Sequence, residues 1–458
     1  MTGGVVTVEE SASAPRRESM FLKIMILAFL MIALLVPLAM IGNIVTERRS
    51  LARQVMDQIG AGWGSRQNIG PVVLSVPYRE TVVDGNGRVS TLDRTARFLP
   101  EDLHIETSVE PQVRRRSLYD VVVYTAHVTM TGYFKRPNLA LVRLDNPNCV
   151  LWDDVKLTLP VSDRKGINPG ASLKWRDTAV ELSPAAPAIS ASLFGTGLEA
   201  PVSNLRELDA DMKLPFEINM DVKGTEWFQL QPAGKTTVAH LTSNWKDPSF
   251  MGGFLPDTRQ IGNDGFEATW RLTSLSRAYP QAWRDFEMSE NDQAVNLIKS
   301  GFGASFIRPV DTYQQTERSV KYGALFILLT FTTFVLVELL QSVRVHPVQY
   351  LMVGAALCLF YLLLLSLSEQ VSFGLAYAIG ATATIGITTM YTVNVLGGVR
   401  QGLLTGVGLT TLYTFLYVLL QLEDYALLTG SVALFLILGF VMFITRRINW
   451  YELRRSPA

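Results

Sequence analysis

Cysteine and histidine are scarce in this chain. Only two cysteines and four histidines occur among its 458 residues. Cys149 lies in a segment of ordinary soluble composition and Cys358 in a hydrophobic run, so we expect no disulfide between them. The sequence also lacks any group of Cys and His with metal-ligand spacing. We therefore expect neither a metal site nor a bound cofactor.

An excess of charge of either sign is also missing. Lys and Arg number 41, Asp and Glu also number 41, and the formal net charge at pH 7 is zero. Proteins that bind nucleic acid usually carry a basic patch, so we expect no nucleic-acid partner. The H-E-x-x-H, G-x-S-x-G and phosphate-loop motifs do not occur. These absences favour a protein that is not an enzyme.

Hydrophobic residues are abundant but concentrated in one N-terminal run and in the last third of the chain. Each long run in that last third can cross about 30 Å of hydrocarbon as a helix. Lipid offers no hydrogen-bond partners to the backbone, so helix is the expected conformation. The five expected spans are Tyr322–Gln341, Val348–Leu367, Val371–Leu396, Leu403–Leu420 and Tyr425–Thr445.

The N-terminal run Met20–Asn43 predicts one more span, kinked at Pro37. A signal peptide would have an apolar region of about 7–15 residues followed by a small-residue cleavage site. This run is longer and continues into Ile44 and Val45. We therefore expect an uncleaved first helix after a disordered tail, and a polytopic membrane protein of six transmembrane helices.

The charges of the short loops predict the orientation, because Lys and Arg collect on the cytoplasmic side. The loops after the second and fourth expected helices and the C-terminal tail carry Arg344, Arg400, Arg446 and Arg447. The alternate loops carry Glu369, Glu423 and Asp424 and no basic residue. We expect both termini in the cytoplasm and the large segment between the first two helices in the periplasm.

That large segment reads as β-structure. Glu47–Ile59 has helical spacing and should continue the first helix outward, and a short helix is expected at Gln293–Gly301. Between them, period-two alternation predicts many short strands, typical of an antiparallel sandwich or two stacked sheets. Pro232-Ala233-Gly234 is a hairpin signal. The expected strands are Val72–Tyr78, Arg88–Phe98, Leu103–Val109, Tyr119–Tyr133, Val150–Leu159, Ser172–Leu182, Pro215–Lys223, Trp227–Gln231, Thr236–Asn244 and Gly265–Leu272.

The predicted organisation therefore has five parts. They are a cytoplasmic tail (residues 1–19), a first transmembrane helix (20–45), a periplasmic domain that is all-β or mainly β (46–319), a five-helix transmembrane bundle (320–447) and a second tail (448–458).

A stretch rich in tryptophan, phenylalanine, glycine and proline in the predicted β domain offers a candidate binding surface. One interpretation is an ordered loop packed on the sheet. The other is a recognition surface for a glycan, a lipid head group or a protein, since exposed aromatic residues often anchor binding. The candidate residues are Trp245, Phe250, Phe254, Trp270 and Trp283.

Ser162-Asp163-Arg164-Lys165 matches the S-x-x-K motif of penicillin-recognising serine enzymes. Its companion S-D-N and K-T-G elements are absent, and the motif ends a predicted strand instead of starting a helix. We interpret it as a turn in which Asp163 accepts hydrogen bonds from the local backbone.

Ionisable residues in the predicted membrane segments form a second candidate set, because charge in hydrocarbon is costly. Glu338 lies near the inner end of the second helix, where Arg344 or His346 could pair with it. It is either an interfacial carboxylate or part of a proton or ion relay. Glu369, Glu423 and Asp424 could cap helices at the outer side and meet arginines of the external domain.

Long and specific runs occur at Ser243–Phe250, Gly265–Trp270, Tyr279–Gln281, His346–Tyr350, Phe360–Glu369 and Leu422–Ser431. These runs resemble the CreD family of bacterial inner-membrane proteins, and the similarity extends from about Met20 to Tyr451. The resemblance implies a cell-envelope integrity protein of Gram-negative bacteria, linked to a two-component stress regulon, the β-lactam response and colicin tolerance. The family has no established biochemical activity, so no catalytic residue can be transferred.

Three hypotheses follow. The first is a non-enzymatic envelope protein whose periplasmic domain binds a protein, glycan or lipid partner. The second is a transporter or a protein that handles lipids or ions, gated by that domain. The third, a periplasmic hydrolase, is disfavoured because no nucleophile–base pair is visible. All three hypotheses expect contact with the lipid bilayer, and none predicts an oligomeric state.

Overall fold

The computed structural model describes residues 20–83, 85, 88–116, 119–144, 146–185, 196–203, 205–206, 208–209, 211–285, 293–306, 312–341, 345–395, 398–422 and 425–446. The chain divides into two compact units. The helical unit comprises Met1–Ser50 and Val310–Ala458, and the β unit comprises Leu51–Pro309.

Helix α1 (Met20–Trp63) is a single helix of 44 residues with Pro37 inside it. At about 1.5 Å per residue it is roughly 66 Å long, about twice the thickness of the hydrocarbon layer. The boundary between the two units falls within it, after Ser50. The prediction that Glu47–Ile59 continues the first helix is confirmed.

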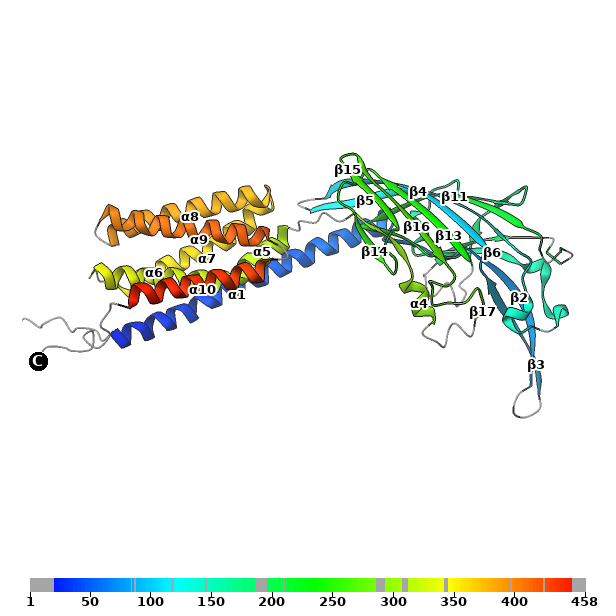
Figure 1. Ribbon diagram of the computed structural model, residues 1–458, viewed down its shortest axis with the longest axis horizontal. Coiled ribbons are helices and arrows are strands. Elements are labelled where there is room, and N and C mark those ends of the chain that lie inside the picture. Colours follow the sequence, from blue (N-terminus) through cyan, green and yellow to red (C-terminus); the bar gives the residue numbers. More distant parts are fainter. Residues whose placement is uncertain are drawn as a thin grey trace, which may run out of the picture. The chain divides into compact units, whose positions relative to one another are not determined.

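The rest of the helical unit consists of helices arranged side by side with the first half of α1 (Figure 1). They are α5 (Thr312–Lys321), α6 (Gly323–Gln341), α7 (Pro347–Ser368), α8 (Phe373–Val395), α9 (Val399–Gln421) and α10 (Ala426–Thr445). Within the described residues, five helices including α1 are long and apolar enough to cross a membrane. The count becomes six if α5 and α6, which meet at a bend of 43°, form one broken span.

Aromatic rings and small residues hold this bundle together. Phe360 of α7 contacts Tyr377 of α8 and Tyr413 of α9, with ring centroids 5.4 and 4.8 Å apart. The Tyr377 hydroxyl donates a hydrogen bond of 2.7 Å to the Tyr413 carbonyl. At Gly406 of α9, a Cβ would lie 2.7 Å from Oγ1 of Thr389. Helices α8 and α9 therefore approach closely because this position carries no side chain.

The β unit contains two sheets, shown together in Figure 1. Sheet A consists of β1 (Gln67–Ile69), β2 (Val73–Val83), β3 (Val89–Phe98), β6 (Lys156–Val161), β9 (Ser183–Pro184), β10 (Thr196–Pro201), β12 (Trp227–Leu230), β14 (Ser249–Gly252), β17 (Ala282–Arg284) and β18 (Phe302–Ser305). Sheet B consists of β4 (Asp102–Arg116), β5 (Tyr119–Phe134), β7 (Ser172–Trp175), β8 (Thr178–Glu181), β11 (Leu214–Thr225), β13 (Thr236–Ser243), β15 (Thr258–Gly262) and β16 (Gly265–Thr273). The short helix α4 (Gln293–Lys299) lies where a helix was predicted.

Strand order explains how the sheets are built. Sheet A runs β14-β18-β12-β1-β6-β2-β3-β17, with β10 and β9 joined to β6, and sheet B runs β15-β16-β13-β4-β5-β11-β7-β8. The long β4–β5 hairpin forms the centre of sheet B and pairs from Asp102↔Tyr133 to Arg116↔Tyr119. Most pairs are antiparallel, but β1 pairs with β12 and β13 with β4 in parallel.

Three details of the predicted strands are wrong. The hairpin expected at Pro232-Ala233-Gly234 is a crossover, because β12 belongs to sheet A and β13 to sheet B. The strand expected over Ser172–Leu182 is the hairpin β7–β8, which turns at Arg176 with a left-handed φ of 55°. The strand expected from Val150 begins only at Lys156, since a 3₁₀ turn occupies Trp152–Asp154.

The two sheets share one hydrophobic core, to which both contribute buried residues. Alternation along β4 is regular: every second residue from Leu103 to Val109 is buried, Thr107 included, whereas His104, Glu106 and Ser108 between them are exposed. One face of sheet B therefore covers the core and the other is open to solvent. This alternation is the reason that sequence periodicity located most of the strands.

Candidate functional site

The five aromatic residues proposed as a binding surface do not form one surface. Phe250 lies on β14 and Trp283 on β17, and these strands are the two opposite edges of sheet A. Trp283 is only 5 % exposed. Its strand pairs with β3, where Trp283 faces Arg97 in register. Trp283 is therefore a core residue, at the opposite end of the strand order of sheet A from Phe250.

Trp270 is also a core residue, with 1 % of its surface exposed. Its ring lies 5.2 Å from that of Phe302, and its Nε1 donates a hydrogen bond of 3.2 Å to the Phe254 carbonyl. It occupies an inward position in the alternating pattern of β16. For Trp270 and Trp283 the prediction of an exposed surface is wrong, because both rings are buried in the core of the β unit.

Trp245, Phe250 and Phe254 are partly buried and pack against the core. The Trp245 ring meets Phe306 edge-on at 6.5 Å, and the Phe250 ring meets Phe266 at 5.5 Å. The indole Nε1 of Trp245 donates to the Asp247 carbonyl at 3.1 Å. These contacts fit the interpretation of an ordered segment packed on the sheet. A binding role for the exposed edges of these rings stays a prediction.

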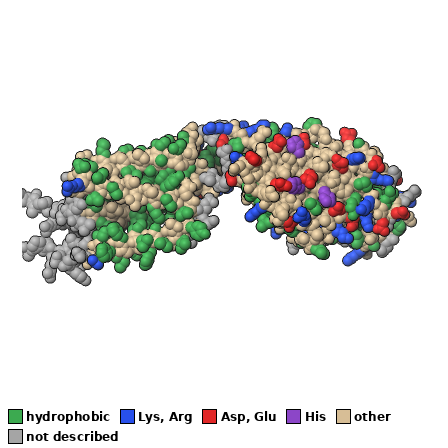
Figure 2. Space-filling model, turned by 45° about the horizontal axis from the view of Figure 1, so that its top comes forward, with side chains coloured by type: hydrophobic (Ala, Val, Ile, Leu, Met, Phe, Trp, Pro, Cys, Tyr) green, Lys and Arg blue, Asp and Glu red, His purple; other side chains and the backbone are tan. Residues whose placement is uncertain are grey.

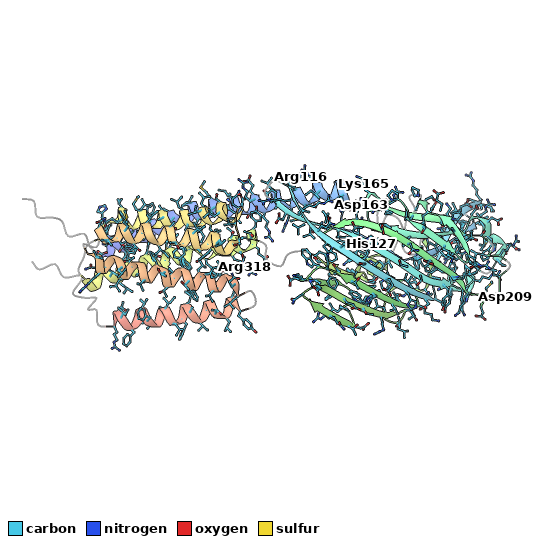
Figure 3. All side chains as sticks on the ribbon, turned by 90° about the horizontal axis from the view of Figure 1, so that it is seen from above. Arg116, His127, Asp163, Lys165, Asp209 and Arg318 are labelled. Carbon is cyan, nitrogen blue, oxygen red and sulfur yellow. The ribbon has the colours of Figure 1, made fainter. Side chains whose placement is uncertain are left out.

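The outer face of sheet B carries a group of polar side chains that the sequence analysis did not single out. His104, His127 and His240 lie there beside carboxylates. Figure 2 shows histidines next to acidic side chains on the β unit, and Figure 3 labels His127. The nitrogen–oxygen distances are 3.0 Å for His104–Asp102, 2.7 Å for His127–Asp221 and 3.2 Å for His240–Glu267. The alternation of His104 and Glu106 on β4 was the signal that could have placed them on one face.

The strand register places side chains of this face in rows across neighbouring strands. His240, Glu106, Thr129 and Asn219 lie side by side on β13, β4, β5 and β11. The Thr129 hydroxyl donates to Oδ1 of Asn219 at 2.8 Å. Among the described residues, no three His, Cys, Asp or Glu side chains gather closely enough to hold a metal ion. The face is therefore broad and polar, with both donors and acceptors.

Asp163 forms the turn that the sequence analysis predicted. Its Oδ1 accepts a hydrogen bond of 3.0 Å from the Lys165 backbone N–H, and its Oδ2 accepts from the N–H and hydroxyl of Ser65 at 3.0 and 2.9 Å. Burial alone would raise the pKa of Asp163, but the hydrogen bonds from Ser65 and Lys165 outweigh it and lower this pKa. Figure 3 shows Asp163 and Lys165 together.

In the helical unit, Glu338 of α6 is paired with Lys23 of α1. The Tyr350 hydroxyl donates to Oε2 of Glu338 at 3.1 Å, and Lys23 also donates to the Val345 carbonyl at 2.8 Å. The side chains of Lys23 and Glu338 are 16 % and 18 % exposed. Three separate helices therefore meet at one mostly buried carboxylate.

His346, one of the residues expected to pair with Glu338, has a different role. His346 is the N-cap of α7, where its Nδ1 accepts from the Val348 N–H at 3.3 Å and its own N–H donates to Oε1 of Gln349 at 2.9 Å. Arg344 lies outside the described residues. The expected pairing with His346 is therefore wrong, and the partner is Lys23, 315 positions away in the chain.

A second group of charges lies among α1, α5 and α7. Glu369 accepts a hydrogen bond of 3.4 Å from the Tyr313 hydroxyl and lies 3.8 Å from Nε of Arg48. Glu317 binds Arg49 at 3.0 Å and Lys321 at 2.9 Å. These pairs hold parts of the helical unit to one another. Glu423 and Asp424 lie outside the described residues.

Comparison with known proteins explains this combination of helices and sheets. The family model for the inner membrane protein CreD matches residues 19–451. The chain belongs to the CreD family. Inner membrane protein CreD of Escherichia coli (strain K12) is 30 % identical over 441 residues, which cover 95 % of this chain and 94 % of that protein.

The solved structures add less. A Legionella pneumophila protein that carries the description nutrient binding aligns with 56 % of this chain and 85 % of its own, at 8 % identity and a TM-score of 0.21. That score is too low for an argument about fold.

Membership of the CreD family confirms the resemblance that the sequence motifs indicated. This CreD-family chain is an inner membrane protein with several candidate spans and a large β-rich domain. Two motifs now have structural roles. His346–Tyr350 supplies the cap of α7 and the tyrosine that binds Glu338, whereas Gly265–Trp270 forms most of β16 and delivers Trp270 to the core.

Proposed function

We propose that this CreD-family protein maintains the integrity of the cell envelope under stress, including the β-lactam response and colicin tolerance, and that it acts by binding and not by catalysis. The observation that carries the proposal is the open outer face of sheet B. It presents histidines, carboxylates and hydroxyls on one open face, where a protein or glycan surface can form many hydrogen bonds at once.

The proposal includes a topology of six spans. In it α5 and α6 act together as one broken span, both termini are cytoplasmic, and the β unit lies in the periplasm between the first two spans. The 43° bend between α5 and α6 and the arginines of the loops after the second and fourth spans support it.

Reporter fusions test the topology. Alkaline phosphatase joined after Gln231 should be active and a fluorescent protein joined there should be dark, since only the phosphatase matures in the periplasm. Fusions after Thr445 should behave in the opposite way. A fluorescent Gln231 fusion with an inactive phosphatase counterpart would contradict the topology.

Site-specific photocrosslinking tests the binding surface. Photoreactive residues at Glu106, Thr129 and His127 should form adducts in intact cells, because all three lie on the open face. Arg259 on the edge strand β15 is the exposed control and should form few adducts. Adducts at Trp245 and Phe250 with none at the three face positions would indicate that the aromatic segment is the binding surface.

Hydrolysis of cell-wall fragments by the purified protein would overturn the claim that it is not an enzyme.

The Lys23–Glu338–Tyr350 group favours one alternative, a transporter or a protein that handles lipids or ions. Glu338→Gln removes the charge but keeps the shape. Loss of envelope protection by this variant at normal abundance would favour ion coupling. If the double variant Lys23→Met with Glu338→Gln restores protection, the pair has a structural role, and the binding hypothesis stands.

A further inference from the structure

The loop Ser274–Gln281 between β16 and β17 has an inverted arrangement of side chains. Leu275 is 95 % exposed, whereas Arg277 is only 8 % exposed. Arginine is almost never fully buried unless it is paired, whereas leucine is one of the residues most often buried. The loop therefore holds a cation inside the domain and an apolar side chain outside it.

A second buried arginine in the same unit shows how a buried guanidinium is normally satisfied. Nε and Nη2 of Arg97 donate to the two oxygens of Asp285 at 2.9 and 3.0 Å, and Nη1 donates to the Ser75 hydroxyl. This is a bidentate pair between an arginine and a carboxylate. It provides the standard against which Arg277 can be measured.

Arg277 lacks the carboxylate that Arg97 has. Its Nη2 donates to Oε1 of Gln281, and its guanidinium lies 4.7 Å from the centre of the Tyr279 ring. Nε and Nη1 are buried and have no hydrogen-bond partner within the described residues. Burial lowers the pKa of Arg277, yet arginine keeps its charge at neutral pH.

The residues that follow Arg277 are firmly anchored. Nε2 of Gln281 donates to the carbonyls of Leu99 and Pro100 at 3.1 and 2.8 Å, and the Tyr279 hydroxyl donates to the Pro232 carbonyl. The half of the loop that contains Leu275 is exposed. The N–H groups of Ser274 and Ser276 donate to the carbonyls of Lys235 and Thr273 at 2.7 and 3.0 Å. Lifting of the exposed half requires that these two bonds break, while Tyr279 and Gln281 keep Arg277 in place.

We propose that Arg277 is the receptor of an oxyanion site, which takes a carboxylate or phosphate group when the exposed half of the loop lifts. The bound anion accepts a hydrogen bond from Nη1 or from Nε, the two donors that the domain leaves unpaired. These two N–H groups lie on different edges of the guanidinium, so the anion does not bind as Asp285 binds Nε and Nη2 of Arg97. Leu275 lies four positions from the anchored Tyr279 and can close over the apolar part of the ligand.

The full-length protein purified in detergent provides the test. Its thermal unfolding is followed during titration with sodium phosphate and, separately, with sodium acetate, at an ionic strength held constant with chloride. An anion present at about one hundred times its Kd should raise the melting temperature by roughly 5–10 °C. A response to phosphate alone assigns a phosphate site, and a response to acetate alone assigns a carboxylate site.

Three variants decide whether Arg277 is responsible. Arg277→Leu should abolish the shift, and Arg277→Lys should weaken it, because the flexible ammonium of lysine lacks the rigid, planar arrangement of donors that arginine has. Arg271→Leu, at an exposed position on the preceding strand, should keep the full shift. Should Arg277→Leu not fold, the comparison of Arg277→Lys with Arg271→Leu decides. Equal shifts in all variants, or no saturable shift in the unchanged protein, would overturn the proposal.

Discussion

The two units place polarity in opposite ways, as Figure 2 shows for their surfaces. On α10 of the helical unit, Phe435 is 76 % exposed and Phe443 60 %. On the open face of sheet B, histidines and carboxylates take these outer positions instead. The interiors are alike, since each unit has a hydrocarbon core that also encloses a few polar side chains, such as Thr388 and Thr392 among the helices and Arg97 in the β unit.

This difference indicates that the surface of the helical unit is suited to lipid and the surface of the β unit to water. Apolar surface on α10 costs nothing in lipid, whereas threonines inside the bundle can satisfy their hydroxyls on helix carbonyls, as Thr392 does on Thr389. In the β unit, burial of apolar surface removes it from water and is the main stabilising term. The predictions below test this contrast, from the largest expected effect to the smallest.

Trp270→Ala should destabilise the β unit by about 3–5 kcal/mol, because a fully buried indole leaves a cavity. Trp245→Ala, at a partly exposed ring, should cost about 1 kcal/mol. Urea unfolding of the purified protein, followed by circular dichroism, measures both values. Equal losses for the two variants would show that Trp270 is no more a core residue than Trp245.

Arg97→Leu should cost about 3 kcal/mol, since it leaves the carboxylate of Asp285 without its bidentate partner. The double variant Arg97→Leu with Asp285→Leu should recover most of the loss, because no unpaired charge remains. The same unfolding measurement applies. A double variant as unstable as the single one would mean that packing, and not the ion pair, controls this site.

Phe435→Arg should cost about 2.5 kcal/mol of membrane insertion, because this position lies near the middle of the apolar run Leu428–Thr445. Ser108→Arg on the open face of sheet B should change stability by no more than about 0.5 kcal/mol. The fraction of protein that resists carbonate extraction reports insertion of the first variant. If Phe435→Arg inserts as well as the unchanged chain, α10 does not face lipid.

Local patterns predicted most elements of both units. Alternation along β4 and β5 and the long apolar runs of α7 to α10 depend only on neighbours in the chain, so they could be read from it. Strand pairing could not. The step from β12 to β13 resembles a hairpin locally, yet β12 finds β1 and β18 whereas β13 finds β4 and β16. These partners are chosen by contacts between distant segments.

The candidate sites show the same limit. The cost of charge in lipid singled out Glu338, but Lys23 lies at the other end of the chain and no local pattern connects them. Aromatic composition singled out Trp270, although only its inward register on β16 reveals that it is buried. Arg277 gave no signal at all, because its distinction is a missing partner, which only three-dimensional structure can show.

Asp163→Ala should have the smallest effect, about 1 kcal/mol at pH 7, because it removes the cap of one short turn. The pKa of Asp163 is lower in the folded protein than its ordinary value of 3.8. The additional stability from the ionised carboxylate is therefore present above pH 3.8 and is lost as the pH falls through the lower folded pKa. Unfolding measured from pH 7 to pH 3 should show the difference between the two proteins shrinking at the acidic end.

Asp163→Asn retains a side-chain acceptor without a charge, so its difference from the unchanged protein should vanish in acid. If the Asp163→Ala difference does not change with pH, the charge contributes nothing and only the hydrogen-bond geometry matters.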